Sequence, residues 1–329
     1  MSRLICSAFL ALLLTACGSE NVDEPAATDS GERLIPVTTA FGTYNVWTKK
    51  TGDNPTAKVL LLHGGPAATS EYFEVLDSYF DGAGVEYYHY DQLGSARSDQ
   101  PDNDSLWTID RFVDEVEQVR QALGLGPDNF FLLGHSWGGI LAMEYALKYQ
   151  ENLKGLVISN MMSSAMDYDA YANEVLGPML DPDVLAEIMA LEAAEDFANP
   201  RYEELLMAHF YPEHVLRAPP EEWPDAVLRA FGKMNSHIYV LMQGPSEFGI
   251  AGSLETWDRS ADLGRISVPT LVIGAGHDTM DPAHMEWMAS EVQNGRYLLC
   301  PDGSHMAMWD DEEVYAGGLL SFIGDVAGE

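Results

Sequence analysis

Hydrophobic positions from about residue 33 onward alternate between short, wholly apolar runs and longer amphipathic stretches. The runs in "AKVLLLHGG", "NFFLLG", "LKGLVISN" and "VPTLVIGAG" are typical of strands that are buried on both faces. The stretches between them have a helical period. One face of the helix predicted from "TIDRFVDEVEQVRQALGLG" carries Ile109, Phe112, Val113, Val116 and Val119. This alternation predicts an α/β fold, in which a mostly parallel sheet is flanked by helices.

The alternation stops between residues 161 and 250, where no convincing strand occurs. The segment is rich in Met, Ala, Glu and Tyr, and clusters such as "DPD", "NPR" and "APPEEWPD" interrupt it. We interpret it as a helical cap that is inserted into the sheet domain. The core of the fold is therefore predicted in two parts, residues 33–160 and residues 251–329.

The N-terminus has the features of a targeting segment. Arg3 and the apolar run "LICSAFLALLL" are typical of a signal peptide, which we predict over residues 1–16, and the run is too short to span a membrane. The stretch "LTAC" resembles the bacterial lipobox, which implies cleavage before Cys17 and attachment of lipid to that residue. Residues 17–32 would then form a flexible polar tether. The alternative is an ordinary signal peptide with an incidental cysteine.

The lipobox resemblance also implies a location, because such a lipoprotein is anchored by its lipid to a membrane of the bacterial cell envelope. Gly18, rather than an aspartate, follows the cysteine, and by the same resemblance this favours the outer membrane, facing the periplasm. A lipid on Cys17 leaves Cys300 as the remaining thiol, since Cys6 is removed with the signal. No intrachain disulfide is therefore expected.

The chain is strongly acidic, with 52 acidic and 17 basic side chains and a formal net charge of −35. This charge excludes nucleic acid as a partner, because one polyanion repels another. It suits a salty environment or a cationic substrate, and the simpler interpretation is an adaptation for solubility. The sequence holds no H-x-x-x-H pattern and no cysteine-rich cluster, so we predict neither a metal site nor a cofactor.

The stretch "LLGHSWGGI" places Ser136 between Gly134 and Gly138, after a predicted strand and before a predicted helix. Glycines at these positions can simply allow a tight turn. The same G-x-S-x-G pattern in this context is also typical of a nucleophile elbow, in which a sharp turn exposes the serine hydroxyl. A serine hydroxyl is a weak nucleophile, so the second interpretation requires a base elsewhere in the chain.

Candidate partners follow two late strands. Asp278 comes after "PTLVIGAGH" and His305 after "RYLLCPDGS". The carboxyl ends of parallel strands meet at one edge of a sheet, and the order Ser, Asp, His is that of a hydrolase triad. We predict His305 as the general base and Asp278 as the acid that orients it. Asp281, which precedes a proline, is expected to cap a helix, and Asp302 is a further competitor.

Catalysis also needs donors for a developing oxyanion. The backbone N–H of Trp137, directly after the nucleophile, is one candidate, and the loop "HGGP" at residues 63–66 is expected to supply the other. Glycine in that loop would let the backbone approach a substrate closely.

Six segments of the chain, "HGGP", "YDQLGSARSDQP", "GHSWGG", "EYALKYQENLKGLVISN", "MQGPSEF" and "GSHMAMWDD", resemble the proline iminopeptidase family of the α/β-hydrolase superfamily. The resemblance is taken to cover nearly the whole predicted mature domain, from about residue 57 to residue 325. The resemblance implies the same triad and oxyanion donors at Gly65 and Trp137. It also implies that Glu247, in "GPSEF", binds the free α-amine of the substrate.

The resemblance implies a serine aminopeptidase that releases N-terminal proline or another small apolar residue from short peptides or aminoacyl substrates. Two positions depart from the family pattern: Ala67 stands where glycine is common, and Thr279 stands where members can carry a second glutamate. A carboxylesterase or amidase acting on neutral acyl substrates would use the same triad and is the alternative. A catalytically silent binding protein of the envelope is a third possibility, against which the intact order of the triad argues.

Overall fold

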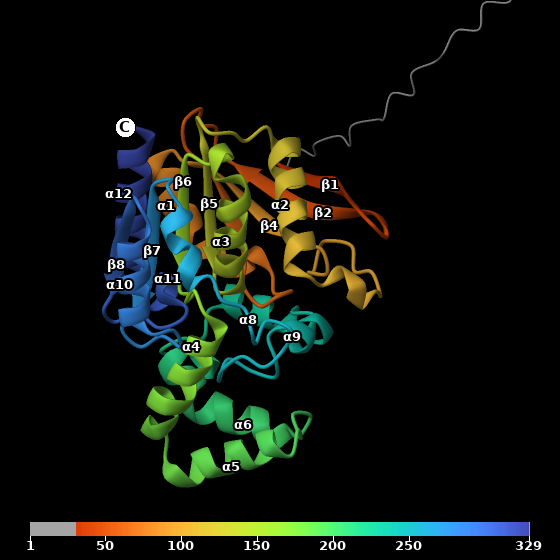
Figure 1. Ribbon diagram of the computed structural model, residues 1–329, viewed down its shortest axis with the longest axis vertical. Coiled ribbons are helices and arrows are strands. Elements are labelled where there is room, and N and C mark those ends of the chain that lie inside the picture. The colour runs from red at the N-terminus through yellow and green to blue at the C-terminus, as the bar shows by residue number, and fades with distance from the viewer. Residues whose placement is uncertain (1–30, 329) are drawn as a thin grey trace, which may run out of the picture.

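The computed structural model describes residues 31–328, in which an eight-stranded sheet has helices on both faces (Figure 1). The strand order is β1-β2-β4-β3-β5-β6-β7-β8. The pairs β1–β2 and β2–β4 are antiparallel and the other pairs are parallel, which confirms the predicted mostly parallel sheet. The strands are β1 (Glu32–Thr39), β2 (Gly42–Thr51), β3 (Lys58–Leu62), β4 (Glu86–Asp91), β5 (Phe130–His135), β6 (Gly155–Ser159), β7 (Thr270–Ala275) and β8 (Gly295–Cys300).

The N-terminal predictions lie outside this range. The predicted signal peptide, Cys17 and nearly all of the predicted tether precede the described residues. Within residues 31–328, no helix combines the length and the apolar character that crossing a membrane requires.

The two faces of the sheet are covered by different helices. One apolar core lies under α2 (Ile109–Leu123), α3 (Trp137–Tyr149) and α10 (Pro282–Glu291). The other lies under the 3₁₀-helix η1 (Ser70–Leu76), α1 (Asp77–Ala83), α11 (Ala307–Asp310) and α12 (Glu312–Ala327). Successive side chains of a strand point to opposite faces, so Leu60 and Leu132 enter the first core while Leu61 and Leu133 enter the second.

Between β6 and β7 the described chain forms six α-helices, with short 3₁₀- and π-helices between and after them, and no strand among its named elements. They are α4 (Ala165–Tyr171), α5 (Pro182–Ala193), α6 (Pro200–His209), α7 (Tyr211–His214), α8 (Asp225–Gly232) and α9 (Ser236–Met242). In Figure 1 these helices form the lower part of the molecule, and α5 and α6 lie farthest from the sheet. We refer to this part as the cap.

The cap is fastened to the sheet domain through a buried carboxylate. Glu71 of η1 accepts hydrogen bonds from Arg229 Nη1 at 2.5 Å and from Lys233 Nζ at 2.7 Å, at the C-terminal end of α8. Burial by itself would raise the pKa of Glu71, but Lys233 and Arg229 outweigh it and hold that pKa below its usual value. The cationic end of α8 is thus tied to the core beside the carboxyl edge of the sheet.

Candidate active site

Ser136 lies at a sharp turn between β5 and α3. Its backbone has φ 56° and ψ −128°, a conformation that residues with side chains rarely adopt. The flanking glycines are required by close packing, because a Cβ on Gly134 would lie 1.9 Å from the carbonyl oxygen of Gly138, and one on Gly138 would lie 2.1 Å from that of Leu62. The turn has the geometry expected of a nucleophile elbow.

Asp278 and His305 meet at the same edge of the sheet, in the loops after β7 and β8. His305 Nδ1 lies 2.8 Å from Asp278 Oδ1, and both side chains are buried. Burial disfavours the protonated imidazole, but the charge and hydrogen bond of Asp278, aided by Glu247, raise the pKa of His305 above its usual value. The hydroxyl of Ser136 makes no hydrogen bond to another protein atom within residues 31–328, and Ser136 and His305 line the same cavity.

Asp278 has a second partner, Asn160, which the sequence analysis missed. Asn160 directly follows β6, and its Nδ2 donates to Asp278 Oδ2 at 2.7 Å. The backbone of Asn160 has φ 52°, and asparagine tolerates this left-handed region better than most residues. Its position after a strand, like those of Asp278 and His305, was the signal that could have found it.

The competing acids lie elsewhere. Asp281 caps α10, and its Oδ1 accepts from the backbone N–H of Ala283 at 2.9 Å. Asp302 is exposed, and its carbonyl oxygen accepts from Arg217 at 2.8 Å. Among the three candidate acids, Asp278 is the one that the structure joins to His305.

The two predicted oxyanion donors lie beside Ser136. Gly65 adopts φ 106°, which favours glycine, and Trp137 is the first residue of α3, where backbone N–H groups lack helical partners. Within the described range, neither N–H donates to another protein group. Ala67, one of the two departures from the family pattern, has φ 63°, which lies in the left-handed region of backbone conformation that favours glycine.

A chain of hydrogen bonds joins the oxyanion loop to the loop of His305. The N–H of Gly64 donates to the Tyr72 hydroxyl at 2.6 Å, which lies 2.9 Å from His135 Nδ1. Nε2 of His135 lies 2.7 Å from the carbonyl oxygen of His305. Burial and the neighbouring His305 hold the pKa of His135 well below its usual value, so the ring is neutral and donates through Nε2. This series of hydrogen bonds was not predicted, because its residues are up to 170 positions apart in the sequence.

Glu247 enters the cavity from the cap side. The cavity lies between the cap and the sheet domain, and its lining includes Ser136, His305 and Glu247. Apolar lining from the cap comes from Val215, Ala230, Phe231 and Met234. One carboxylate therefore shares a small, mostly apolar space with the predicted nucleophile.

Three tyrosines hold the Glu247 segment in place. Tyr239 donates to Glu247 Oε1 at 2.7 Å, Tyr168 donates to the Glu247 carbonyl oxygen at 2.8 Å, and Tyr211 accepts from the Glu247 N–H at 3.3 Å. No lysine or arginine forms an ion pair with Glu247 among the described residues. The partner that the structure gives to the Glu247 carboxylate is therefore the neutral hydroxyl of Tyr239.

Thr279, the other departure from the family pattern, does not line the cavity. It is fully buried, and its hydroxyl lies 3.3 Å from Asp278 Oδ1 and 3.3 Å from His305 Nδ1.

Within residues 31–328, no group of three or more His, Cys, Asp or Glu side chains is arranged to hold a metal ion.

The chain is similar to known proteins over most of its length. The model of the alpha/beta hydrolase fold family matches residues 58–312. A proline iminopeptidase of Flavobacterium johnsoniae is 58% identical over 296 residues, which cover 90% of this chain and 99% of that protein. A proline iminopeptidase of Elizabethkingia meningoseptica is 57% identical over 295 residues, which cover 89% of this chain and 98% of that protein.

A solved structure shows the same likeness. The crystal structure of a proline iminopeptidase from Mycobacterium smegmatis matches with a TM-score of 0.80 and 29% sequence identity, and the match covers 90% of this chain and 98% of that one. These findings confirm the family that the sequence motifs predict: the chain belongs to the proline iminopeptidase family of the α/β-hydrolases.

Proposed function

We propose that the protein is a serine aminopeptidase that releases N-terminal proline, or another small apolar residue, from short peptides through an acyl-enzyme. The observation that carries this proposal is the presence of Glu247 in the same cavity as Ser136 and His305. The relatives named proline iminopeptidase support it, with identities of 57% and 58% over most of the chain.

The geometry suits acyl transfer. In our proposal Ser136 Oγ attacks the scissile carbonyl carbon while His305 Nε2 accepts the hydroxyl proton. The carbonyl oxygen becomes an oxyanion, which the N–H groups of Gly65 and Trp137 stabilise. His305 then returns the proton to the leaving amine as the C–N bond breaks, and a water molecule, activated in the same way, hydrolyses the ester on Ser136. Asp278 orients the imidazole and stabilises its charged form.

Glu247 explains why such an enzyme would act on chain ends. The α-amine of an N-terminal residue is one bond from its Cα and therefore close to the scissile carbonyl. An ammonium in an apolar cavity needs a charged partner, and Glu247 supplies one. A peptide bond in the middle of a chain has no such ammonium and gains nothing from Glu247.

The test compares an amine substrate with a neutral one. Glu247→Gln removes one charge of a desolvated pair, which costs about 2–5 kcal/mol, or roughly 30- to 4,000-fold in kcat/KM on a prolyl arylamide. Hydrolysis of a short-chain aryl ester should be nearly unchanged at pH values where His305 is neutral. The matched control is Glu192→Gln, because Glu192 is a cap glutamate that also accepts from a tyrosine, Tyr202, at 2.8 Å, but does not line the cavity.

The other outcomes of this test would lead to different conclusions about Glu247 or about the function of the protein. Equal losses on both substrates would mean that Glu247 supports the fold or the triad. A loss on neither would favour the carboxylesterase or amidase alternative. A wild-type protein that hydrolyses neither substrate and does not react with a serine-directed phosphonate would favour the silent binding protein.

We also propose that the chain is a lipoprotein of the bacterial outer membrane, anchored through Cys17 and facing the periplasm. The proposal rests on Arg3, the apolar run after it and the lipobox-like "LTAC". Full-length protein should fractionate with membranes and incorporate labelled fatty acid, and Cys17→Ser should abolish the label. Native protein found unlabelled in the cytoplasm would contradict this.

A further inference from the structure

The two predicted oxyanion donors come from loops that are distant in sequence. The N–H of Gly65 belongs to the loop after β3, and the N–H of Trp137 to the first turn of α3. Donors of this kind work when they are held to within about 0.5 Å of the productive geometry. The first loop contains Gly64 and Gly65, and glycine adds conformational freedom. The spacing of the donors therefore needs an external restraint.

The side chain of Gln92, directly after β4, spans the two loops. Its Oε1 accepts from the indole Nε1–H of Trp137 at 2.8 Å, and its Nε2 donates to the carbonyl oxygen of His63 at 3.0 Å. An indole N–H can only donate and a carbonyl oxygen can only accept, so these partners fix the orientation of the carboxamide. All three residues are buried, and water does not compete for these bonds.

His63 also holds the backbone of Gln92. The N–H of Gln92 donates to His63 Nε2 at 3.1 Å, and His63 Nδ1 lies 2.9 Å from the carbonyl oxygen of Gly64. Desolvation by burial lowers the pKa of His63, so the ring stays neutral with a proton on Nδ1 and an acceptor at Nε2. Both ring nitrogens of His63 therefore have a defined partner, the N–H of Gln92 for Nε2 and the carbonyl oxygen of Gly64 for Nδ1.

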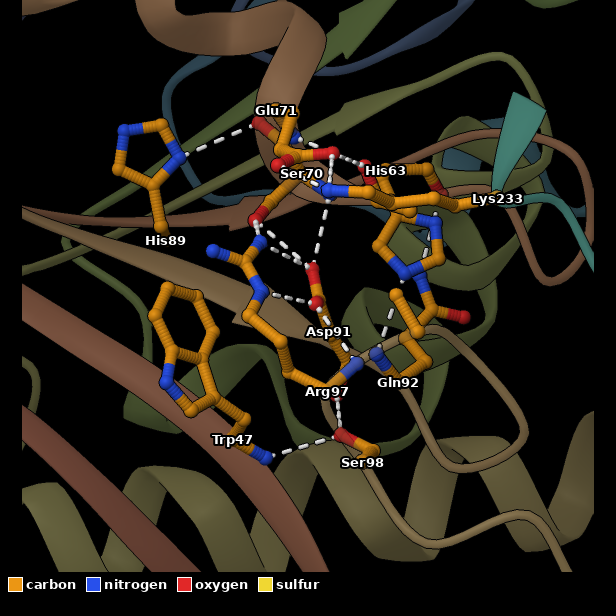
Figure 2. A network of polar contacts seen from close by, with 12 residues as sticks. Trp47, His63, Ser70, Glu71, His89, Asp91, Gln92, Arg97, Ser98 and Lys233 are labelled. Atoms are coloured by element: carbon orange, nitrogen blue, oxygen red, sulfur yellow. Dashed lines mark hydrogen bonds and ion pairs between the residues drawn. The ribbon is translucent and has the colours of Figure 1, made fainter. Parts of the chain in front are cut away.

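The residues on both sides of Gln92 are fixed as well. Figure 2 shows the buried carboxylate of Asp91, which accepts from Arg97 Nε at 2.6 Å and from the N–H of Ser70 at 3.0 Å. On the other side, the N–H of Leu93 donates to Glu115 at 2.9 Å. The carboxamide of Gln92 thus extends from a backbone with little freedom to move.

We propose that Gln92 is a positioning residue, which sets the spacing of the Gly65 and Trp137 donors by holding both of their loops with one carboxamide. Gln92 does not line the cavity, so it acts through these loops and not on the substrate. The inference rests on the proposed acyl-transfer function.

Two variants test the inference. Gln92→Leu keeps a similar volume and removes both side-chain hydrogen bonds, so kcat should fall roughly 10- to 100-fold, less than the loss expected when a donor itself is removed. KM should change by less than about threefold, because no substrate contact is lost. In Gln92→Glu, the protonated carboxyl can both donate and accept, whereas the ionised form can only accept. The ratio of its kcat to that of the wild type should therefore rise as the pH falls, and it is measured above the acid limbs of both proteins, where His305 is neutral in each.

The matched control is Gln150→Leu. Gln150 also uses both ends of its carboxamide, with Nε2 donating to Arg265 O at 2.9 Å and Oε1 accepting from Ser267 N–H at 2.7 Å, but it lies away from the cavity. This variant should lower the melting temperature and keep the wild-type kcat. The proposal is overturned if Gln92→Leu keeps kcat within about twofold of the wild type, or if the Gln92→Glu ratio does not depend on pH. If Gln92→Leu does not fold, the Gln92→Glu ratio decides.

All measurements use both a prolyl arylamide and a short-chain aryl ester. Both reactions pass through an oxyanion, so the Gln92 variants should lose similar factors on each. A wild type that cleaves the ester alone would contradict the proposed aminopeptidase function, and the loss on the ester would still decide the role of Gln92.

Discussion

Asn160 and Asp278 are joined by a hydrogen bond of 2.7 Å, in which Asn160 Nδ2 donates to Asp278 Oδ2. The other oxygen, Oδ1, faces His305 Nδ1 at 2.8 Å. Both oxygens of the carboxylate are therefore engaged, and it cannot rotate away from the imidazole without losing a bond. The geometry of the acid and base is set before a substrate arrives.

The Asn160 contact gives a first prediction. Asn160→Gly removes the side chain and suits the backbone at φ 52°, so it adds no strain. A buried acceptor that loses one partner costs about 1–3 kcal/mol of stability. We expect kcat to fall roughly tenfold with little change in KM, because a loosened acid orients His305 less well. Steady-state kinetics and thermal unfolding measure both effects, and an unchanged kcat would show that the Asn160 contact is not needed to position Asp278.

A second prediction concerns the triad. Ser136→Ala should abolish turnover and labelling by a serine-directed phosphonate, because the attacking oxygen is absent. Asp278→Asn should lower kcat roughly 10⁴-fold, as for the aspartate of other triads. Asp281→Asn and Asp302→Asn are the controls, since neither side chain contacts His305. A severe loss of kcat in one of these variants, with a mild loss in Asp278→Asn, would show that the other aspartate is the acid that orients His305.

A third prediction follows from the charges around His305. Its neutral form is the base, so activity is lost as the pH falls through its pKa. Burial alone would lower that pKa, but Asp278 raises it above 6.5, with a further contribution from Glu247. The acid limb of kcat/KM should therefore lie above pH 6.5. In Glu247→Gln the negative charge is gone, the pKa of His305 falls, and the limb should move to lower pH.

The pH profile should be measured with an aryl ester, whose hydrolysis does not need the amine contact. Glu192→Gln is the control, because Glu192 is not among the groups that shift the pKa of His305. An acid limb that stays in place in Glu247→Gln would mean that Glu247 is too well solvated to act on His305.

A fourth prediction concerns the attachment of the cap. Glu71→Gln leaves Arg229 and Lys233 without their buried partner. The side chain of Glu71 is 8% exposed but those of Arg229 and Lys233 are 34% and 47% exposed, so we expect a loss of about 1–2 kcal/mol instead of the 3–5 kcal/mol of a fully buried pair. KM should rise, because α8 carries part of the cavity wall.

The same ion pairs set a dependence of stability on pH. The pKa of Glu71 is depressed in the folded protein, so its contribution is present above the unfolded pKa and is lost as the pH falls through the folded pKa. Chemical unfolding of the wild type and of Glu71→Gln at neutral and acidic pH would show it. The difference in unfolding free energy between the two proteins should shrink on acidification.

Much of the fold could be predicted because its signals are local. Wholly apolar runs and helical periods each lie within about twenty residues, and the parallel arrangement follows from their alternation. Ser136, Asp278 and His305 could be found because each lies within a few residues of the end of a predicted strand, and parallel strands bring their carboxyl ends together.

The rest of the site depends on contacts that no local pattern shows. Gln92 meets Trp137 across 45 positions, and His135 meets the His305 carbonyl across 170. Glu247 follows the last cap helix, in a segment without regular structure, and only the resemblance to a known family indicated it. Asn160 had a usable signal, but asparagine after a strand is also common in ordinary turns.

The cavity lies between the cap and the sheet domain, and Ser136 at its base is only 5% exposed. In the proposed aminopeptidase, a polypeptide would reach this serine by inserting its N-terminus beneath the cap. A protein whose first residues are packed into its own fold cannot do so. Frayed termini and the fragments left by endoproteases can. If the protein is the proposed aminopeptidase, its cap would therefore distinguish chains by whether their ends are folded, before any side chain is recognised.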